Sequence, residues 1–328
     1  MPSKYPFKPL DFEKVSTYPI SSRKSKVHAG MFGKPFDESE NILSFISKLP
    51  HILAAENLRL LIRAILFARE SRKQIIWGLG GHVIKVGLGP IIADLMDHGF
   101  VTAIAMNGSS AIHDFEVAYR GATSEEVEEQ IGSGRFGMAR ETGEFMNRAI
   151  NQAAVDDIGI GECLGRFIER NEPPFEFEAL SLLSRAYRRN IPVTVHVAVG
   201  TDIIHIHPEA SGPELGKAAY RDFKLFCTVS EGLSGGGVYL NVGSSVVLPE
   251  VFLKAISVVR NLGHELEEFT TANLDFIQHY RPTQNVLKRP TQNSGQAIAL
   301  TGHHEIMIPL LAAALKAVAN QNVPTTRS

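Results

Sequence analysis

From Asn41 onward, hydrophobic and polar positions follow patterns that predict regular structure. Ile42, Phe45, Ile46 and Leu49 recur at helical spacing, and a second helix is expected around residues 58–68. Six runs rich in β-branched residues follow, most of them before a helical stretch: residues 74–77, 101–106, 191–198, 237–242, 268–272 and 297–300. This alternation predicts an α/β fold with a doubly wound, mostly parallel sheet of six or more strands and helices on both faces.

The chain divides into an arm and a body. Residues 1–40 are rich in Pro, Lys, Ser and Gly without sustained periodicity, so we expect an arm that is extended over the body or a neighbouring subunit, or partly disordered. Residues 41–328 are expected to form a single α/β domain. A mainly helical insert at about 112–190 should pack on the sheet, because no linker-like stretch brackets it.

Composition favours a small-molecule partner. With 44% hydrophobic residues the 328-residue chain can bury a sizeable core, and its net charge of −2 provides no field that would gather nucleic acid or an anionic membrane. The polar, proline-broken N-terminus and the absence of a bilayer-length apolar run predict a soluble, cytoplasmic protein. Cys163 and Cys227 are expected to be buried free thiols, since two isolated cysteines suit a reducing compartment.

Small and polar residues follow each apolar run. In an open parallel sheet these positions share one edge, where ligands bind, and small residues and helix N-terminal amides there suit phosphate or carboxylate. The same residues also cap helices and form turns in any α/β protein, but six clusters along one edge favour a ligand site. The clusters are Gly80-Gly81-His82, Asn107-Gly108-Ser109-Ser110, Gly200-Thr201-Asp202, Gly243-Ser244-Ser245, Thr270-Thr271-Ala272-Asn273 and Gly302-His303-His304.

The usual phosphate-binding motifs are incomplete. The segment Gly78-Leu79-Gly80-Gly81-His82-Val83 begins like a Rossmann fingerprint but ends on Val83, where a small residue should let helix and strand pack closely. A phosphate-binding loop is suggested by residues 212–218, but it is one residue short and lacks the magnesium-binding hydroxyl. A standard Rossmann turn is therefore disfavoured.

Taken in order over residues 70–318, these segments resemble the deoxyhypusine synthases, NAD-dependent enzymes that move an aminobutyl group from spermidine to a protein lysine. The resemblance is carried by Gly80 to Gly87, Ala105 to Asp114, Ile191 to Ile204, Gly235-Gly236-Gly237-Val238, Thr270 to Asn273, Arg281-Pro282 and Ile306 to Leu311. It implies an NAD-binding, Rossmann-like fold and a homo-oligomer, dimer or tetramer, with sites near the subunit interface. The cofactor-binding positions it implies are Gly81, His82, Asn107, Gly108, Ser109, Ser110, Gly236, Gly237, Thr271 and Ala272.

The chain also departs from that family. The family's substrate-binding lysine falls on Pro290, two residues after Lys288, and His113 replaces a glutamate. A site without the amine cannot hold an aminobutyl group as an imine, so we expect an NAD-dependent transferase or oxidoreductase that acts on a small amine or amino-acid-like substrate. True deoxyhypusine synthase activity through Lys288, a non-catalytic dinucleotide-sensing protein and a histidine-rich metal hydrolase remain alternatives.

Five residues are candidates for the chemistry. Four of them follow strand ends: His113, Asp114, Asp202 and His303. A histidine can exchange protons near neutral pH. The fifth is Lys288, which would need burial to become a reactive amine. The alternative reading of the histidines and Asp114 is helix capping, and that of Lys288 is a solvated loop cation. His205 and His207 with Asp202 and His196 suggest a metal only weakly, and we expect none.

Overall fold

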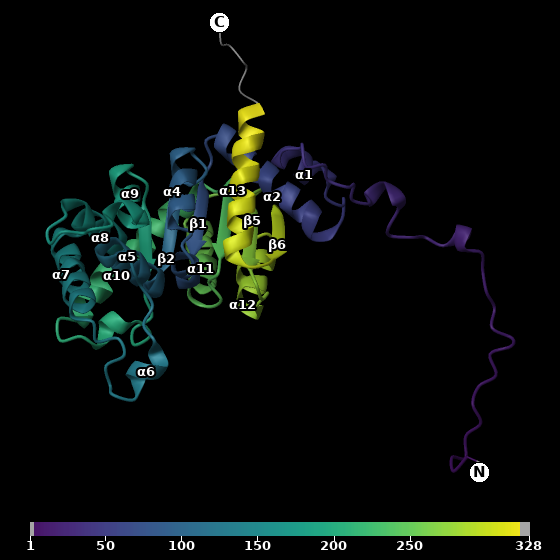
Figure 1. Ribbon diagram of the computed structural model, residues 1–328, viewed down its shortest axis with the longest axis horizontal. Coiled ribbons are helices and arrows are strands. Elements are labelled where there is room, and N and C mark those ends of the chain that lie inside the picture. The colour runs from purple at the N-terminus through teal and green to yellow at the C-terminus, as the bar shows by residue number, and fades with distance from the viewer. Residues whose placement is uncertain (1–2, 322–328) are drawn as a thin grey trace, which may run out of the picture.

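The computed structural model describes residues 3–321 and contains one six-stranded sheet (Figure 1). Its spatial order is β3-β2-β1-β4-β5-β6, and all five pairings are parallel. The doubly wound α/β class predicted from the sequence is confirmed. The strands are β1 (Ile75–Leu79), β2 (Ala103–Asn107), β3 (Val193–His196), β4 (Val238–Val242), β5 (Thr270–Asp275) and β6 (Gln296–Thr301).

Helices connect these strands and surround the sheet. The two helices expected from periodicity are present as α1 and α2, and α1 begins because the Asn41 side chain accepts the backbone N–H groups of Leu43 and Ser44. The helices are α1 (Ile42–Lys48), α2 (Leu53–Glu70), α3 (Gly81–Lys85), α4 (Gly89–Asp97), α5 (Gly108–Arg120), α6 (Val127–Ile131), α7 (Arg140–Asp156), α8 (Ile160–Arg170), α9 (Leu182–Arg188), α10 (Gly212–Glu231), α11 (Val247–Asn261), α12 (Tyr280–Pro282) and α13 (His304–Gln321), with 3₁₀ turns η1 (Ile20–Ser22), η2 (Ala29–Met31), η3 (Glu178–Leu180) and η4 (Ile203–Ile206) and a π-helical segment η5 (Thr283–Lys288).

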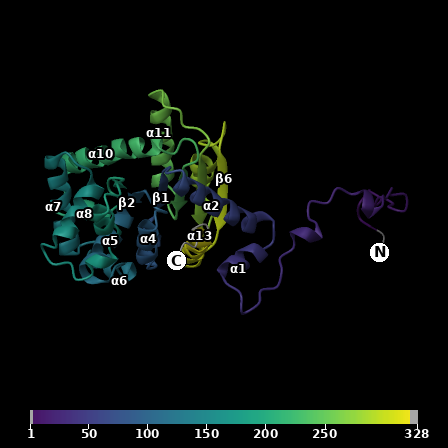
Figure 2. The ribbon, with the colours of Figure 1, turned by 90° about the horizontal axis from the view of Figure 1, so that it is seen from above.

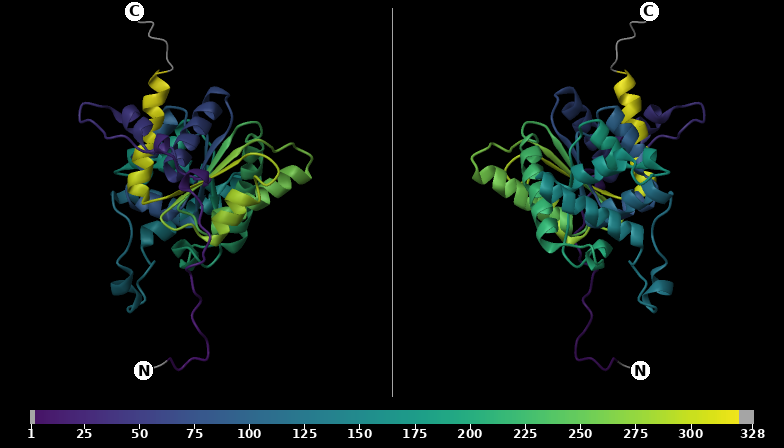
Figure 3. Two further views of the ribbon diagram at one scale, coloured as in Figure 1. Left: turned by 90° about the vertical axis from the view of Figure 1, so that its right-hand side faces the viewer. Right: turned by 90° about the vertical axis from the view of Figure 1, so that its left-hand side faces the viewer.

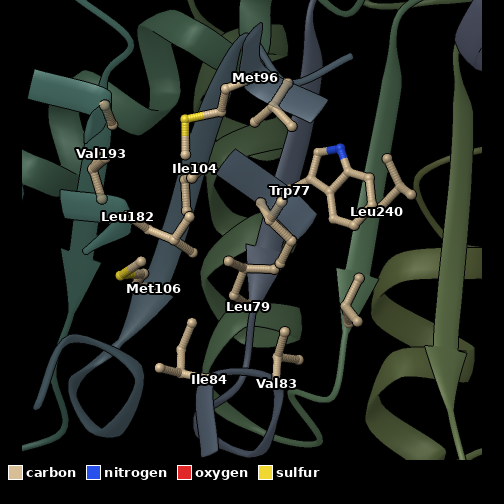
Figure 4. Packing of buried hydrophobic residues seen from close by; sticks show 14 of the residues in the cluster. Trp77, Leu79, Val83, Ile84, Met96, Ile104, Met106, Leu182, Val193 and Leu240 are labelled. Atoms are coloured by element: carbon tan, nitrogen blue, oxygen red, sulfur yellow. The ribbon is translucent and has the colours of Figure 1, made fainter. Parts of the chain in front are cut away.

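Both faces of the sheet are buried. Successive strand residues point to opposite faces, so Trp77 and Leu79 pack with α2, α4, α5, α9 and α13, while Ile76 packs with α10 and α11. Figure 2 shows the two helical layers on either side of the strands, and Figure 4 shows the first of these cores around Trp77 and Ile104. Trp77, fully buried, donates its indole N–H to the carbonyl of Phe100 over 3.1 Å, which makes it a core residue.

Two strands end at least two residues later than the sequence pattern indicates. β1 continues to Leu79 and β5 continues to Asp275, so Thr271 and Ala272 are buried inside β5 instead of following it. Gly236 and Gly237 directly precede β4 and therefore lie at the amino edge of the sheet. The prediction that Thr271 and Ala272 follow their strand at the carboxyl edge is wrong, because an apolar run alone does not fix the boundary of a strand. The amino-edge position of Gly236 and Gly237 separates these two positions, which the resemblance implied for the cofactor, from the crevice at the carboxyl edge.

The helices α5 to α9 form the connection between β2 and β3. Within this connection, α6 extends beyond the carboxyl edge of the sheet (Figure 1). Residues 3–40 carry short turns only, expose almost all of their side chains and run away from the body (Figure 3). In residues 3–321, no helix is both long enough and apolar enough to cross a membrane.

Candidate active site

The site lies at the carboxyl edge of the sheet, beside β1, where the order in which the chain adds strands reverses. The chain leaves β1 toward β2 on one side, whereas β4 lies on the other side of β1, so the loops after β1 and β4 flank the crevice typical of doubly wound sheets. These loops touch directly, since a Cβ on Gly80 would lie 2.0 Å from the carbonyl oxygen of Gly243. Only glycine fits at position 80.

The second wall of the crevice is the start of α5. Asn107 caps the helix by accepting the backbone N–H of Ser110 over 2.9 Å, and the Ser110 hydroxyl lies 2.6 Å from the carbonyl oxygen of Leu79. Ser110 is fully buried and joins α5 to β1. Ser110 therefore links two elements, whereas the half-buried Ser109 lines the cavity described below. Gly81 and Gly108 are buried, and the space that a Cβ would need there is occupied by Ser109 and Asp202.

A cavity of about 260 Å³ opens between α3, α5 and the loop after β3. It brings together His113 and Asp202, two residues that the sequence predicted for the chemistry. The ionisable and hydroxyl groups that line it are Lys85, Ser109, His113, Glu116, Glu125 and Asp202. Three carboxyl groups face a single lysine, so the cavity suits a positively charged or hydrogen-bond-donating ligand better than an anion.

Asp202 is the unusual group in this cavity. Its residue is 9% exposed, and its Oδ2 atom has no hydrogen-bond partner among the described residues. Burial raises the pKa of its carboxyl group to about 6. A Cβ on Gly108 would lie 2.0 Å from that oxygen, so the glycine admits the carboxylate, and His205 Nε2 is 3.9 Å away.

His113 lies on the next turn of α5. Its Nδ1 is 2.7 Å from the Thr123 hydroxyl, which in turn donates to Glu116. Burial, reinforced by the positive charge of Lys85, lowers the pKa of His113 to about 4. The imidazole is therefore neutral at neutral pH and able to accept a proton.

Asp114 points away from the cavity. It is 1% exposed and accepts hydrogen bonds from the Ser181 hydroxyl (2.6 Å) and from the backbone N–H groups of Leu182 (2.8 Å) and Leu183 (3.1 Å). Burial raises its pKa to about 6 although these hydrogen bonds oppose the shift. The carboxylate holds the start of α9, so the structure gives no support to a catalytic role for Asp114.

Aromatic rings gather at the other half of the carboxyl edge. His303, exposed just before α13, stacks on Phe276 with ring centroids 6.0 Å apart, and His82 lies 6.1 Å from the same phenylalanine. The neighbouring His304 is buried, lies 5.6 Å from the His82 ring and makes a hydrogen bond to the carbonyl of Leu274. Burial lowers the pKa of His304.

Lys288 lies away from this edge. It ends the η5 segment, is exposed, and sits two residues before Pro290, whose carbonyl accepts a hydrogen bond from Arg260 at the end of α11. Because α11 follows β4 and leads back to the start of β5, its C-terminal end lies at the amino edge of the sheet. The structure therefore does not bring Lys288 together with His113, Asp202 and His303.

The histidine pair proposed weakly for a metal is not on a strand. His205 belongs to the 3₁₀ turn η4, so a spacing of two residues does not place it and His207 on one face. His207 instead contacts the carbonyl of Gly137 over 2.9 Å. Over residues 3–321, no group of three or more histidine, cysteine or acidic side chains is arranged to hold a metal ion.

Several residues of the site were not singled out from the sequence. Asn241 donates to Asn273 over 2.7 Å and Asn273 donates to Gln278 over 2.8 Å, an amide chain that ties the ends of β4 and β5 together. Glu116 follows His113 by three positions on α5, a spacing that places two side chains on one helix face and could have revealed it. Thr123 gave no such signal, because a loop brings it back to α5.

Comparisons with known proteins identify the fold. No protein-family profile matches the chain, and no curated protein matches it. The ternary complex of AgrE with ornithine and NAD⁺ superposes with a TM-score of 0.54 at 14% identity, over 82% of this chain and 34% of that one. This chain thus spans about a third of the AgrE chain.

Two smaller proteins match more evenly. A LOR/SDH-type protein from Methanococcus maripaludis S2 has a TM-score of 0.50 and 16% identity over 82% of this chain and 71% of that one. A protein assigned as a deoxyhypusine synthase, from Entamoeba histolytica, has a TM-score of 0.50 and 13% identity over 87% of this chain and 96% of that one. The chain therefore has the deoxyhypusine-synthase-like α/β fold, as its sequence resemblance predicts.

Proposed function

We propose that this chain is an NAD-dependent enzyme that acts on a small amine or amino-acid-like substrate at the carboxyl edge of its sheet. The observation that carries the proposal is the buried Asp202 carboxylate, whose Oδ2 has no partner in the described part of the chain. Leaving such a group unsatisfied costs stability, and unsatisfied groups of this kind are found where a ligand completes them. A substrate ammonium group would supply the missing donor and charge.

The charge of the cavity supports this substrate class. Glu116 and Glu125 add to the negative charge of Asp202, whereas Lys85 is the one cation in the lining. A volume of about 260 Å³ limits the occupant to a small molecule, at the lower end of typical ligand cavities. Ornithine, bound by AgrE in the complex that shares this fold, belongs to the class that we propose.

The carboxyl edge also has features that fit a dinucleotide. Lys85 and His82 stand exposed on the short helix α3 that follows the β1 turn, where their side chains can contact a pyrophosphate. The stacked rings of Phe276 and His303 offer an exposed flat surface for a base ring. Asp202 sits against the start of α5 and would repel a phosphate there, which favours the β1 turn for the pyrophosphate.

Residue roles follow from this arrangement. Asp202 binds the substrate ammonium, Ser109 lines the approach to the cofactor, and the neutral His113 accepts the proton that the amine loses. NAD, when bound, supplies the hydride acceptor for oxidation of the adjacent carbon. Lys288 at the opposite edge gives no support to aminobutyl transfer through a lysine imine.

A screen of cofactor and substrate tests the proposal. Purified chain is titrated with NAD, NADH and their phosphorylated forms while its unfolding temperature is followed, and absorbance of the reduced nicotinamide is then recorded with amines, amino acids and hydroxy acids. We expect stabilisation by NAD and reduction of NAD with at least one amine. Asp202→Asn should abolish turnover, whereas the exposed Asp157→Asn is the matched control and should leave it unchanged. Binding of NAD without turnover would indicate a dinucleotide-sensing protein, and no binding would refute the proposal.

A further inference from the structure

Three side chains beside the cavity form a connected hydrogen-bond chain. His113 Nδ1 lies 2.7 Å from the Thr123 hydroxyl oxygen, and this hydroxyl donates to Oε2 of Glu116. The other carboxylate oxygen of Glu116 accepts the Thr142 hydroxyl over 3.1 Å. His113 and Glu116 come from α5, while Thr123 comes from the loop that follows it.

The direction of these hydrogen bonds follows from the donors available. An ionised carboxylate only accepts, so the single hydroxyl proton of Thr123 is directed to Glu116. The Thr123 oxygen can then interact with His113 only as an acceptor, which requires a proton on Nδ1. A neutral imidazole carries one ring proton, so Nε2 is left with its lone pair.

The opposite edge of the His113 ring faces the crevice. A Cβ placed on Gly81 would lie 3.2 Å from His113 Cδ2, the atom bonded to Nε2. His113 lines the cavity together with Ser109 and Asp202. The ring is thus held at Nδ1 on its outer side, while its Cδ2–Nε2 edge is directed toward the turn after β1.

We propose that Thr123 and Glu116 are positioning residues that hold His113 in the Nδ1-protonated tautomer, so that Nε2 is the proton acceptor of the cavity. The catalytic part of this inference rests on the proposed function, whereas the tautomer does not. In the reaction, a substrate N–H bond breaks, its electron pair stays on the substrate nitrogen, and its proton binds Nε2. The imidazolium keeps its Nδ1–H donated to Thr123, and the negative charge of Glu116 stabilises it.

Charged groups around His113 set its response to pH. Lys85 from α3 opposes protonation of the ring and lowers its pKa. Glu116 on α5, Glu125 from the loop before α6 and Asp202 from the loop after β3 line the same cavity. Burial raises the pKa of Glu116, and the nearby charge of Glu125 adds to this shift against the hydrogen bonds from Thr123 and Thr142.

The tautomer can be measured without any ligand. In protein labelled with ¹⁵N-histidine, the resonances of His113 are assigned by their loss in His113→Asn, and long-range proton–nitrogen correlations then report which ring nitrogen carries the proton. We expect a protonated Nδ1 and an unprotonated Nε2 in the wild type near neutral pH. A wild-type ring protonated at Nε2 would overturn the inference, even if every variant failed to fold.

Substitutions separate the positioning role from a merely structural one. Thr123→Val keeps the side-chain shape but removes the acceptor, so most of the His113 population should move to the Nε2-protonated tautomer, and Thr123→Ser should restore the wild-type pattern. Thr142→Val is the matched control, because it removes one hydrogen bond to Glu116 without touching His113. An unchanged tautomer in Thr123→Val would refute the role of Thr123.

The outcome is independent of the proposed function. If NAD and amines fail to bind but the tautomer is as expected, the proposed reaction is wrong and the positioning of His113 stands. If turnover is found, Thr123→Val should lower kcat with little change in KM, and Thr123→Ser should recover it. Turnover that is indifferent to Thr123→Val would contradict the catalytic part of the inference.

Discussion

Substitution of Asp202 by asparagine should stabilise the fold while removing function. The carboxylate is buried, its Oδ2 has no partner in the described residues, and its pKa is raised from 3.8 to about 6. Asparagine has nearly the same shape but no charge to desolvate. A buried, unpaired charge that binds a ligand lowers stability in the absence of the ligand, and such groups commonly cause a trade-off between stability and activity.

The magnitude follows from the shift in pKa. About two units correspond to about 3 kcal/mol, and the remaining solvent contact of the side chain reduces this to about 1–3 kcal/mol. Because the folded-state pKa is raised, the native state binds the proton more tightly than the unfolded state, and Asp202 destabilises the fold progressively as pH rises from 3.8 to about 6. The gain in Asp202→Asn should therefore be small near pH 4, at about 0.5 kcal/mol or less, and nearly complete at pH 7.

Urea unfolding at about pH 7.5 and about pH 4, at one protein concentration and without ligand, measures this difference. The exposed Asp157→Asn is the control and should change the free energy of unfolding by less than about 0.5 kcal/mol at both pH values. A loss of stability in Asp202→Asn at the higher pH, or a gain of equal size at both, would refute the reasoning.

Three further substitutions test other parts of the structure. Asp114→Ala should lower the free energy of unfolding by about 2–4 kcal/mol, measured by urea denaturation, because three buried donors at the start of α9 lose their acceptor. Gly80→Ala should cost about 1–3 kcal/mol and weaken NAD binding in calorimetry, since its Cβ would overlap the backbone of Gly243. Lys288→Ala should change stability by less than about 0.5 kcal/mol and leave NAD affinity and turnover intact, because the side chain is exposed and remote; loss of activity would restore the amine-nucleophile reaction.

The sheet was predictable because its signal is local. Each strand appears as a short apolar run, and the alternation with helices determines that the strands are parallel. The ends of β1 and β5 were less predictable, because Gly78 has no side chain to signal a strand and Asn273 and Asp275 are polar, although all three residues are buried. That error displaced the expected cofactor positions at Thr271 and Ala272.

From the sequence, site residues could be predicted only where they lie close to the end of a strand. That His113 and Asp202 lie beside one cavity could be expected because they closely follow strand ends, and parallel strands bring such ends together. The direction of Asp114 could not be predicted, since adjacent residues on a helix point in different directions and only the fold shows which one faces the cavity. Thr123 and the amide chain from Asn241 depend on contacts between segments distant in sequence, which no local pattern encodes.

A structure of this chain determined with NAD and a small diamine or basic amino acid tests the central claim most directly. The account predicts density for the pyrophosphate at the turn after β1, with a flat ring against Phe276 and His303, and an amine nitrogen within hydrogen-bond distance of Asp202 Oδ2. A ligand bound at the amino edge, or a cavity beside Asp202 and His113 that remains without ligand at saturating concentrations, would contradict it.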